Sequence, residues 1–167
     1  MPMNNVVMYM MPPPAYDEGR HGGTRPPRET PLAPFEPSPV IHFTVLGHAP
    51  STNQAYRIVR FGGANGRAGM AISREGKDWK RLVTSSAATV RRLLNAPAPV
   101  WSKPTKVRVA LAWRFARANQ DADGPVKLVL DALQGELYEN DSQIYDYRVT
   151  KSVDPEQGVE ITVEAMP

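Results

Sequence analysis

The feature that most constrains this chain is a nine-residue stretch, 107–115, in which large apolar side chains occupy every second position. Val107, Val109, Leu111, Trp113 and Phe115 alternate with Arg108, Ala110, Ala112 and Arg114. Successive side chains of a β-strand point to opposite faces of a sheet, so this period of two predicts a strand with one buried face. The chain must therefore build a sheet around this segment and cover its apolar side.

Two segments with helical spacing could provide that cover. Between Ser73 and Asn95 apolar residues recur at steps of three and four, and the Ser73 hydroxyl can cap the first turn. A shorter helix is expected to open at Pro125, which has no N–H group to leave unpaired, and to close at Gly135. The apolar stripe of the first helix is Trp79, Leu82, Val83, Ala87, Val90, Leu93 and Leu94, and that of the second is Val126, Val129, Leu130 and Leu133.

Further β-rich stretches complete the expected fold. Strands are predicted at 40–47, 144–151 and 159–164, with a short one at 56–60. Residues 49–53 are expected to form a polar turn, and residues 61–66 a loop. This order of elements predicts an α+β fold in which a mixed sheet is covered by two main helices.

The first 39 residues have a different composition. They contain ten of the 17 prolines and show no hydrophobic period, which is typical of a disordered tail. The alternative is an arm that binds a partner, which the sequence does not identify. The folded domain is expected to span residues 40–167.

Charge and composition narrow the class of function. Residues 40–120 carry 14 basic and 2 acidic side chains, whereas residues 121–167 carry 3 basic and 11 acidic ones. The first segment would suit a polyanion and the second a divalent cation, although two solvated faces that attract each other would give the same pattern. The chain has no cysteine, which excludes disulfides and thiolate sites. It has no apolar run long enough for a membrane span and no secretory signal pattern, so a cytoplasmic location is expected.

The residues most suited to chemistry are carboxylates that follow the 107–115 strand. If the backbone stays extended through Asp121 and Asp123, both carboxylates point to one side, and Lys127 and Asp131 follow at helical spacing. Asp141 would return from the loop before the next strand. Hard oxygen ligands of this kind suit Mg²⁺ or Mn²⁺, which can activate water for phosphodiester hydrolysis.

Plainer explanations exist for each of these residues. A D-x-D pair is common in polar turns, where one aspartate caps a helix. Asp131 can simply pair with Lys127 at the i,i+4 spacing. The histidines His21, His42 and His48 show no ligand spacing, and an ordinary loop residue is the favoured interpretation of His48.

In order and spacing, the chain resembles the RusA family of Holliday junction resolvases, which is found in bacteria and often in phages and prophages. The resemblance covers roughly residues 41–165. A "PS-N--Y" element is present as Pro50, Ser51, Asn53 and Tyr56, and a basic helix follows it. A D-x-D-N-x-x-K-x-x-x-D-A-L signature is present from Asp121 to Leu133, and a D-D-x-Q element is present as Asn140, Asp141, Ser142 and Gln143.

The resemblance implies a homodimer that binds branched, four-way DNA junctions and makes paired symmetric nicks with Mg²⁺. It assigns metal binding and catalysis to Asp121, Asp123 and Asp141, and an essential role to Lys127. Asn140 and Asp131 are candidates for additional site residues. Two positions depart from the pattern: Gly124 replaces the usual asparagine, and Asn140, which keeps a coordinating oxygen but no charge, replaces the first aspartate of D-D.

Phosphate contacts are expected from the basic helix and its surroundings, and Tyr56 and Phe61 could stack on bases at the crossover. Packing in the core is an equally open interpretation of Phe61. The DNA-binding candidates are Tyr56, Arg57, Arg60, Arg74, Lys77, Lys80, Arg81, Arg114 and Arg117. Two other hypotheses remain open at this stage: a junction- or DNA-binding protein that does not cleave, and another kind of metal-dependent DNA nuclease.

Overall fold

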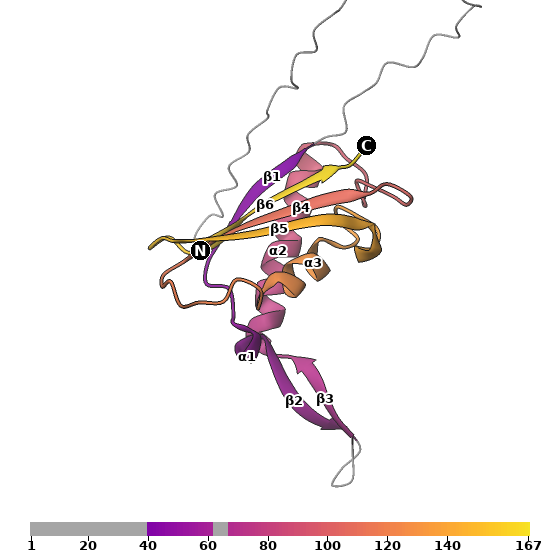
Figure 1. Cartoon of the computed structure of the whole chain (residues 1–167). Helices are drawn as coiled ribbons and strands as arrows, with labels where there is room; N and C mark the ends of the chain where they lie inside the picture. Colours follow the sequence, from indigo (N-terminus) through magenta and orange to yellow (C-terminus); the bar gives the residue numbers. More distant parts are fainter. Residues whose placement is uncertain (1–39, 62–66) are drawn as a thin grey trace, which may run out of the picture.

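A computed structural model describes residues 40–61 and 67–167, and the predicted tail, residues 1–39, lies outside them. The main sheet has four strands in the order β1 (Ile41–Leu46), β6 (Gly158–Ala165), β4 (Val107–Phe115) and β5 (Ile144–Val153). The pairs β1–β6 and β6–β4 are antiparallel, and β4 pairs with β5 in parallel (Figure 1). The predicted mixed sheet is thus confirmed.

Two helices cover one face of this sheet. Figure 1 shows α2 (Arg74–Leu93) and α3 (Val126–Leu133) on the same side of the strands. Along β4 buried and partly exposed residues alternate without exception, as the period of two predicts. Trp113 of β4 is 1% exposed and lies 6.3 Å, centroid to centroid, from the ring of Trp79 in α2. The core therefore lies between the covered face of the sheet and the two helices.

The predicted ends of the two helices are largely confirmed. The Ser73 hydroxyl accepts a hydrogen bond from Gly76 N at 3.0 Å and caps α2. Gly135, just past α3, has a φ of 85°, which favours glycine at the end of a helix. The assignment of Leu93 to the buried stripe was wrong, because its side chain is 63% exposed. The helix ends there, and it is Leu94 that packs against the core.

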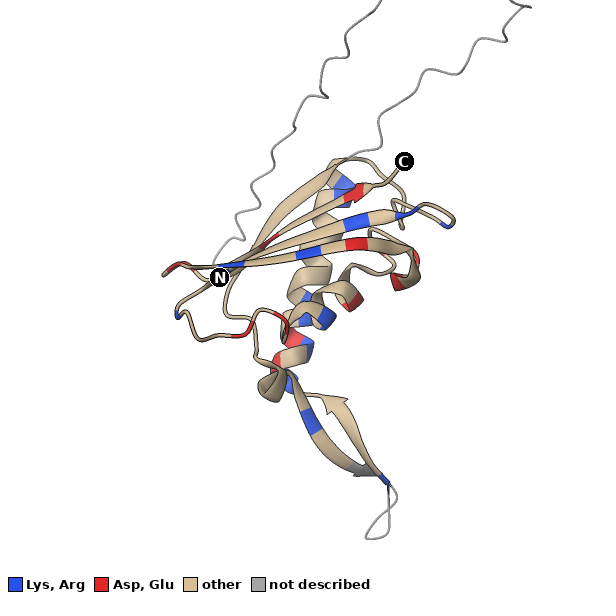
Figure 2. Cartoon of the chain, in the orientation of Figure 1, with Lys and Arg blue, Asp and Glu red and all other residues tan. Residues whose placement is uncertain are grey.

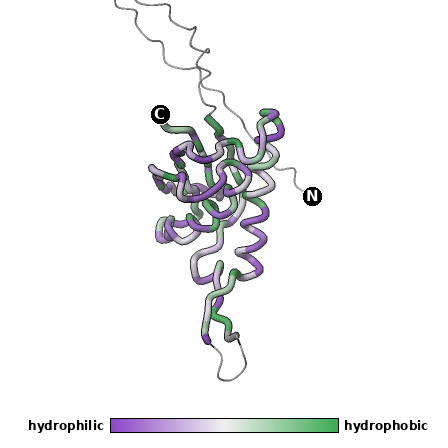
Figure 3. The backbone as a smooth tube through the Cα atoms, turned by 90° about the vertical axis from the view of Figure 1, so that its right-hand side faces the viewer, coloured by the Kyte–Doolittle hydropathy of each residue, from purple (hydrophilic) through white to green (hydrophobic). Residues whose placement is uncertain are grey.

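A projecting hairpin is the main feature that the sequence patterns did not predict. β2 (Tyr56–Phe61) was expected as a short strand, but its antiparallel partner β3 (Arg67–Ile72) was not. The sequence of β3, RAGMAI, lacks alternating large apolar residues, and its side chains remain mostly exposed or half-buried. The hairpin extends away from the main sheet in two perpendicular views (Figures 1 and 3).

A single helical turn, α1 (Thr52–Ala55), occupies part of the stretch that was expected to be a polar turn. It joins the end of β1 to the hairpin and lies beside the start of α2 (Figure 1). No helix in the described ranges is long and apolar enough to cross a membrane.

Candidate active site

The helical turn α1 is packed tightly from two sides. A Cβ atom on Gly76 of α2 would lie 2.6 Å from the backbone oxygen of Ala55, and one on Gly124 would lie 2.7 Å from the Thr52 hydroxyl oxygen. Both distances are too short for real Cβ contacts, so only glycine permits these approaches without a shift. The close packing fixes α1 against the loop that carries the two aspartates.

That loop leaves the end of β4 and turns back toward α3. The backbone bends at Ala122 and Asp123, so the expected extended continuation of the strand is wrong. The chain must reverse here to enter α3, and a straight extension would carry it away from the sheet. Asp121 and Asp123 are both exposed. On the other side of the loop, the Lys151 ammonium of β5 donates to the backbone oxygens of Ala118 at 3.2 Å and Gln120 at 3.0 Å.

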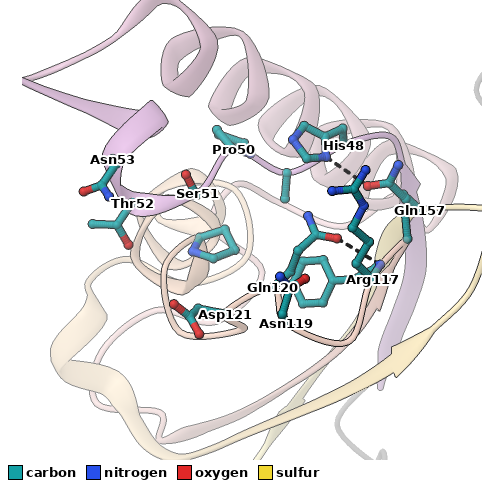
Figure 4. Close-up of a pocket in the computed structure, with 14 residues that line it drawn as sticks. His48, Pro50, Ser51, Thr52, Asn53, Arg117, Asn119, Gln120, Asp121 and Gln157 are labelled. Carbon is teal, nitrogen blue, oxygen red and sulfur yellow. Dashed lines mark hydrogen bonds between the residues drawn. The ribbon is translucent and has the colours of Figure 1, made fainter.

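Asp121 borders a cavity of about 530 Å³. The cavity lies between the loop that precedes α1 and the loop that follows β4, as Figure 4 shows. His48 belongs to its wall, and its Nδ1 lies 2.9 Å from the Gln157 side-chain oxygen. From the sequence His48 was interpreted as an ordinary loop residue, because the two loops meet only in the folded chain.

In the first turn of α3, Lys127 pairs with Asp131 at 3.2 Å, as the i,i+4 spacing predicted. This hydrogen bond raises the pKa of the Lys127 ammonium, and the charge of Asp141 adds to the effect. The Tyr56 ring packs against the core, and its buried hydroxyl has no hydrogen-bond partner in the described part of the chain. Burial raises the pKa of Tyr56, with a further contribution from Asp131. The charges in this region therefore act on one another, and the residues involved are Tyr56, Lys127, Asp131 and Asp141.

The loop that carries Asp141 is held by a buried amide. Gln143 is 4% exposed, and its side-chain oxygen accepts from the backbone N–H groups of Glu139 and Asn140, both at 2.9 Å. Its side-chain nitrogen donates to the backbone oxygens of Trp101 at 3.2 Å and Thr105 at 2.9 Å. Two of these hydrogen bonds close the 3₁₀ turn η2 (Asp141–Gln143) on the residues before it, and the two to Trp101 and Thr105 tie it to the body of the protein.

Asn140 has a structural task in the same turn. Its side-chain oxygen accepts from Ser142 N at 3.0 Å and caps η2. Asparagine and aspartate are about equally good in such a position. The replacement of the family's first aspartate therefore keeps the conformation of the turn and removes one charge.

The acidic residues follow the short helix α3 from the loop before it to the loop after it (Figure 2). Residues 40–61 and 67–167 contain no group of three or more histidine, aspartate or glutamate side chains placed to hold a metal ion. The donor chemistry of Asp121 and Asp123, two exposed carboxylates, nevertheless suits Mg²⁺. The structure brings Asp141 into the neighbourhood of Lys127 and places Asp121 and Asp123 before α3.

The basic candidates differ in how freely they can meet a phosphate. Arg57, Lys77 and Arg117 are exposed. Arg74 and Arg81 are also exposed and share one partner, Asp78, at 3.8 and 3.2 Å.

Lys80 and Arg114 are less accessible to a phosphate than these residues. The side chain of Lys80 is half-buried. Arg114 is 19% exposed and pairs with Glu156 at 3.2 Å. The side chain of Arg60 lies outside the described residues, as does that of Phe61.

The family model of endodeoxyribonuclease RusA matches residues 49–164, which include every element from α1 to β5 and most of β6. The chain belongs to the RusA family. It is thereby a member of a family of Holliday junction-resolving endonucleases. No curated protein matches the chain.

Several residues around this RusA-family site had no assigned role from the sequence. Gln143 appeared in the quoted D-D-x-Q element, where its position three residues after Asn140 is the spacing of a capping box. Thr52 carried no signal, because its close approach to Gly124 joins segments far apart in the chain. Asn119, which lines the cavity beside Asp121, was not singled out either.

Gln143→Ala is expected to lower the free energy of unfolding by about 2–4 kcal/mol, because buried backbone groups such as the Trp101 and Thr105 oxygens lose their partner. Urea denaturation would measure it. Ser142→Ala, which shortens an exposed neighbour, serves as the control and should change stability by less than about 0.5 kcal/mol. Equal stability of the two variants would contradict a structural role for Gln143.

Gly124→Asn, which restores the usual RusA-family residue, is expected to destabilise the protein by about 1–3 kcal/mol through overpacking against Thr52. Adding Thr52→Ala removes the nearest atom and should recover at least about 0.5 kcal/mol in a double-mutant cycle. Strictly additive effects of the two substitutions would show that the contact does not determine the choice of glycine.

Proposed function

We propose that this RusA-family protein is a Mg²⁺-dependent homodimer that resolves four-way junctions by paired symmetric nicks. Asp121, Asp123 and Asp141 are the proposed metal ligands and catalytic acids, and Mn²⁺ is an acceptable substitute. The observation that carries the proposal is the placement of the exposed Asp121 and Asp123 in the loop that enters α3, just before Lys127. The charge of Asp141 contributes to the raised pKa of the Lys127 ammonium.

Lys127 is well placed to meet a phosphate. Its side chain is 70% exposed, and its bond to Asp131 orients the ammonium and raises its pKa. Asp131 therefore acts as a positioning residue, and the ammonium would stabilise negative charge that builds on the phosphate during cleavage. When bound, Mg²⁺ would supply the activation of water and the stabilisation of the leaving oxygen.

The proposed DNA surface follows α2 and continues along the hairpin. A hollow of about 470 Å³ beside α2 is lined by the basic residues Lys77, Lys80, Arg81 and Arg92. The two hairpin strands carry Arg57, Arg60 and Arg67 and no acidic residue. Figure 2 shows blue positions along both elements. Such contacts position DNA by its phosphates and are independent of sequence.

The proposed homodimer is supported by an exposed sheet edge. β5 is the last strand of the main sheet, and its Tyr145 and Tyr147 side chains are 64% and 60% exposed. Uncovered edge strands with large apolar side chains are typical places for another chain to dock. A two-fold dimer would present one site to each of two opposed junction strands.

Asp121→Asn is expected to keep junction binding and to abolish Mg²⁺-dependent nicking, because the amide replaces a charged ligand without changing shape. A labelled four-way junction incubated with Mg²⁺ or EDTA would measure nicking, and gel shifts in EDTA would measure binding. Glu160→Gln removes one charge from β6 and should remain active. Full nicking by Asp121→Asn would refute the assignment, and a wild-type protein that binds but never nicks would favour the non-cleaving alternative.

Lys127→Ala is expected to slow single-turnover cleavage by about 10²–10³-fold while weakening junction binding by less than about threefold, because the ammonium acts on charge in the transition state. Lys103→Ala removes an exposed ammonium elsewhere and is the matched control. A loss confined to binding would show that Lys127 is only a phosphate contact.

A further inference from the structure

The cavity beside Asp121 is large enough to hold a small ligand. It is about 530 Å³ in volume, within the range of small-ligand pockets, and Asp121 lies at one side of it (Figure 4). Most of its wall comes from two loops that lie far apart in the sequence, the one before α1 and the one after β4. A molecule in this cavity would lie directly next to a phosphate held at Asp121.

The lining combines apolar surfaces with uncharged polar groups. The apolar part of the lining comes from Phe115, which is 4% exposed, and from Pro125 and Pro50, which are also buried. Gln120 uses its side-chain oxygen to accept from Arg117 N at 3.2 Å, which leaves its amide N–H groups to donate.

Two polar side chains complete the wall in different ways. The contact with Gln157 holds the His48 ring in place. The exposed Asn119 side chain makes no hydrogen bond to any other described residue, so both its donor and its acceptor are available.

This chemistry fits a nucleobase better than a phosphate. The lining includes one arginine, Arg117, and one carboxylate, Asp121, so it has no excess of positive charge for an anion. A base has flat apolar faces that suit the apolar part of the lining, and its edge carries donors and acceptors that amides can read.

We propose that this cavity receives a base of the junction strand next to the phosphate that is cut, and that Asn119 reads its identity. The inference rests on the proposed function, because Asp121 marks the position of the phosphate. A base must leave its stack to enter such a pocket, which costs least where bases are already unpaired. Unpaired bases at the junction crossover could therefore enter the pocket at low cost. The enzyme's preference for a base would then depend on the structure of the DNA as well as on its sequence.

The test uses the full chain and a set of four-way junctions that differ in single base pairs around the crossover. Single-turnover cleavage by the wild type should vary by about tenfold or more with the base at one position, as expected for one good base contact. Asn119→Ala should reduce that ratio to about threefold or less. Gln134→Ala, which removes an exposed amide outside the cavity, should keep the wild-type ratio.

Asn119→Asp provides a second variant, because it exchanges a donor for an acceptor. It should change the rank order of the bases, whereas a residue that only shapes the loop would lower all rates alike. Uniform cleavage of all junctions by the wild type, or an unchanged ratio in both variants, would overturn the inference.

The same junctions bound in EDTA separate this inference from the proposed function. If the wild type cuts no junction, yet its Kd depends on the base and Asn119→Ala removes that dependence, the proposed nuclease fails and the base pocket stands. If it cuts junctions, but neither rate nor Kd depends on the base, the nuclease stands and the pocket assignment fails.

Discussion

The contact of α1 with two glycines determines how the other parts of the site are placed. Gly76 brings the start of α2 against the backbone of α1, and Gly124 brings the aspartate loop against Thr52. The residue that follows α1, Tyr56, begins the hairpin and places its hydroxyl near Lys127. One turn of helix thus joins the basic helix, the hairpin and the acidic loop, because side chains at either glycine would force these segments apart.

The parallel pairing of β4 with β5 explains why α3 carries the centre of the site. The register pairs Val107 with Ile144 and Phe115 with Val153, so Asp141 precedes the strand end that is opposite to the one the aspartate loop leaves. The chain must cross back between the two strands, and α3 makes most of that crossing (Figure 1). Lys127 and Asp131 lie on this crossing helix, between Asp123 and Asp141 along the chain. The strand ends alone would keep the acids a full strand length apart.

Periodic patterns predicted the fold well where burial has a regular spacing. β4 and α2 have apolar residues at steps of two and of three and four, so their positions could be read from the sequence. β3 could not, since a projecting hairpin buries little surface and RAGMAI has no pattern to show. The acids, Lys127 and their order were visible in the sequence. The roles of Gly124 and Gln143 depend on contacts with segments far away in the chain, which local patterns do not encode.

The two departures from the family pattern have separate local causes, and neither removes a proposed catalytic residue. At position 140 an N-cap is needed, and asparagine provides the same acceptor as aspartate. At position 124 a Cβ atom would lie 2.7 Å from the Thr52 hydroxyl oxygen, so any larger residue would require a shift of Thr52 or of the loop. The first change removes a negative charge next to Asp141, which lowers the repulsion that an approaching phosphate would meet there. The glycine at position 124 lacks the polar side chain of asparagine, and it allows α1 to lie closer to the aspartate loop. Neither change alters the proposed catalytic residues, which are Asp121, Asp123, Lys127 and Asp141.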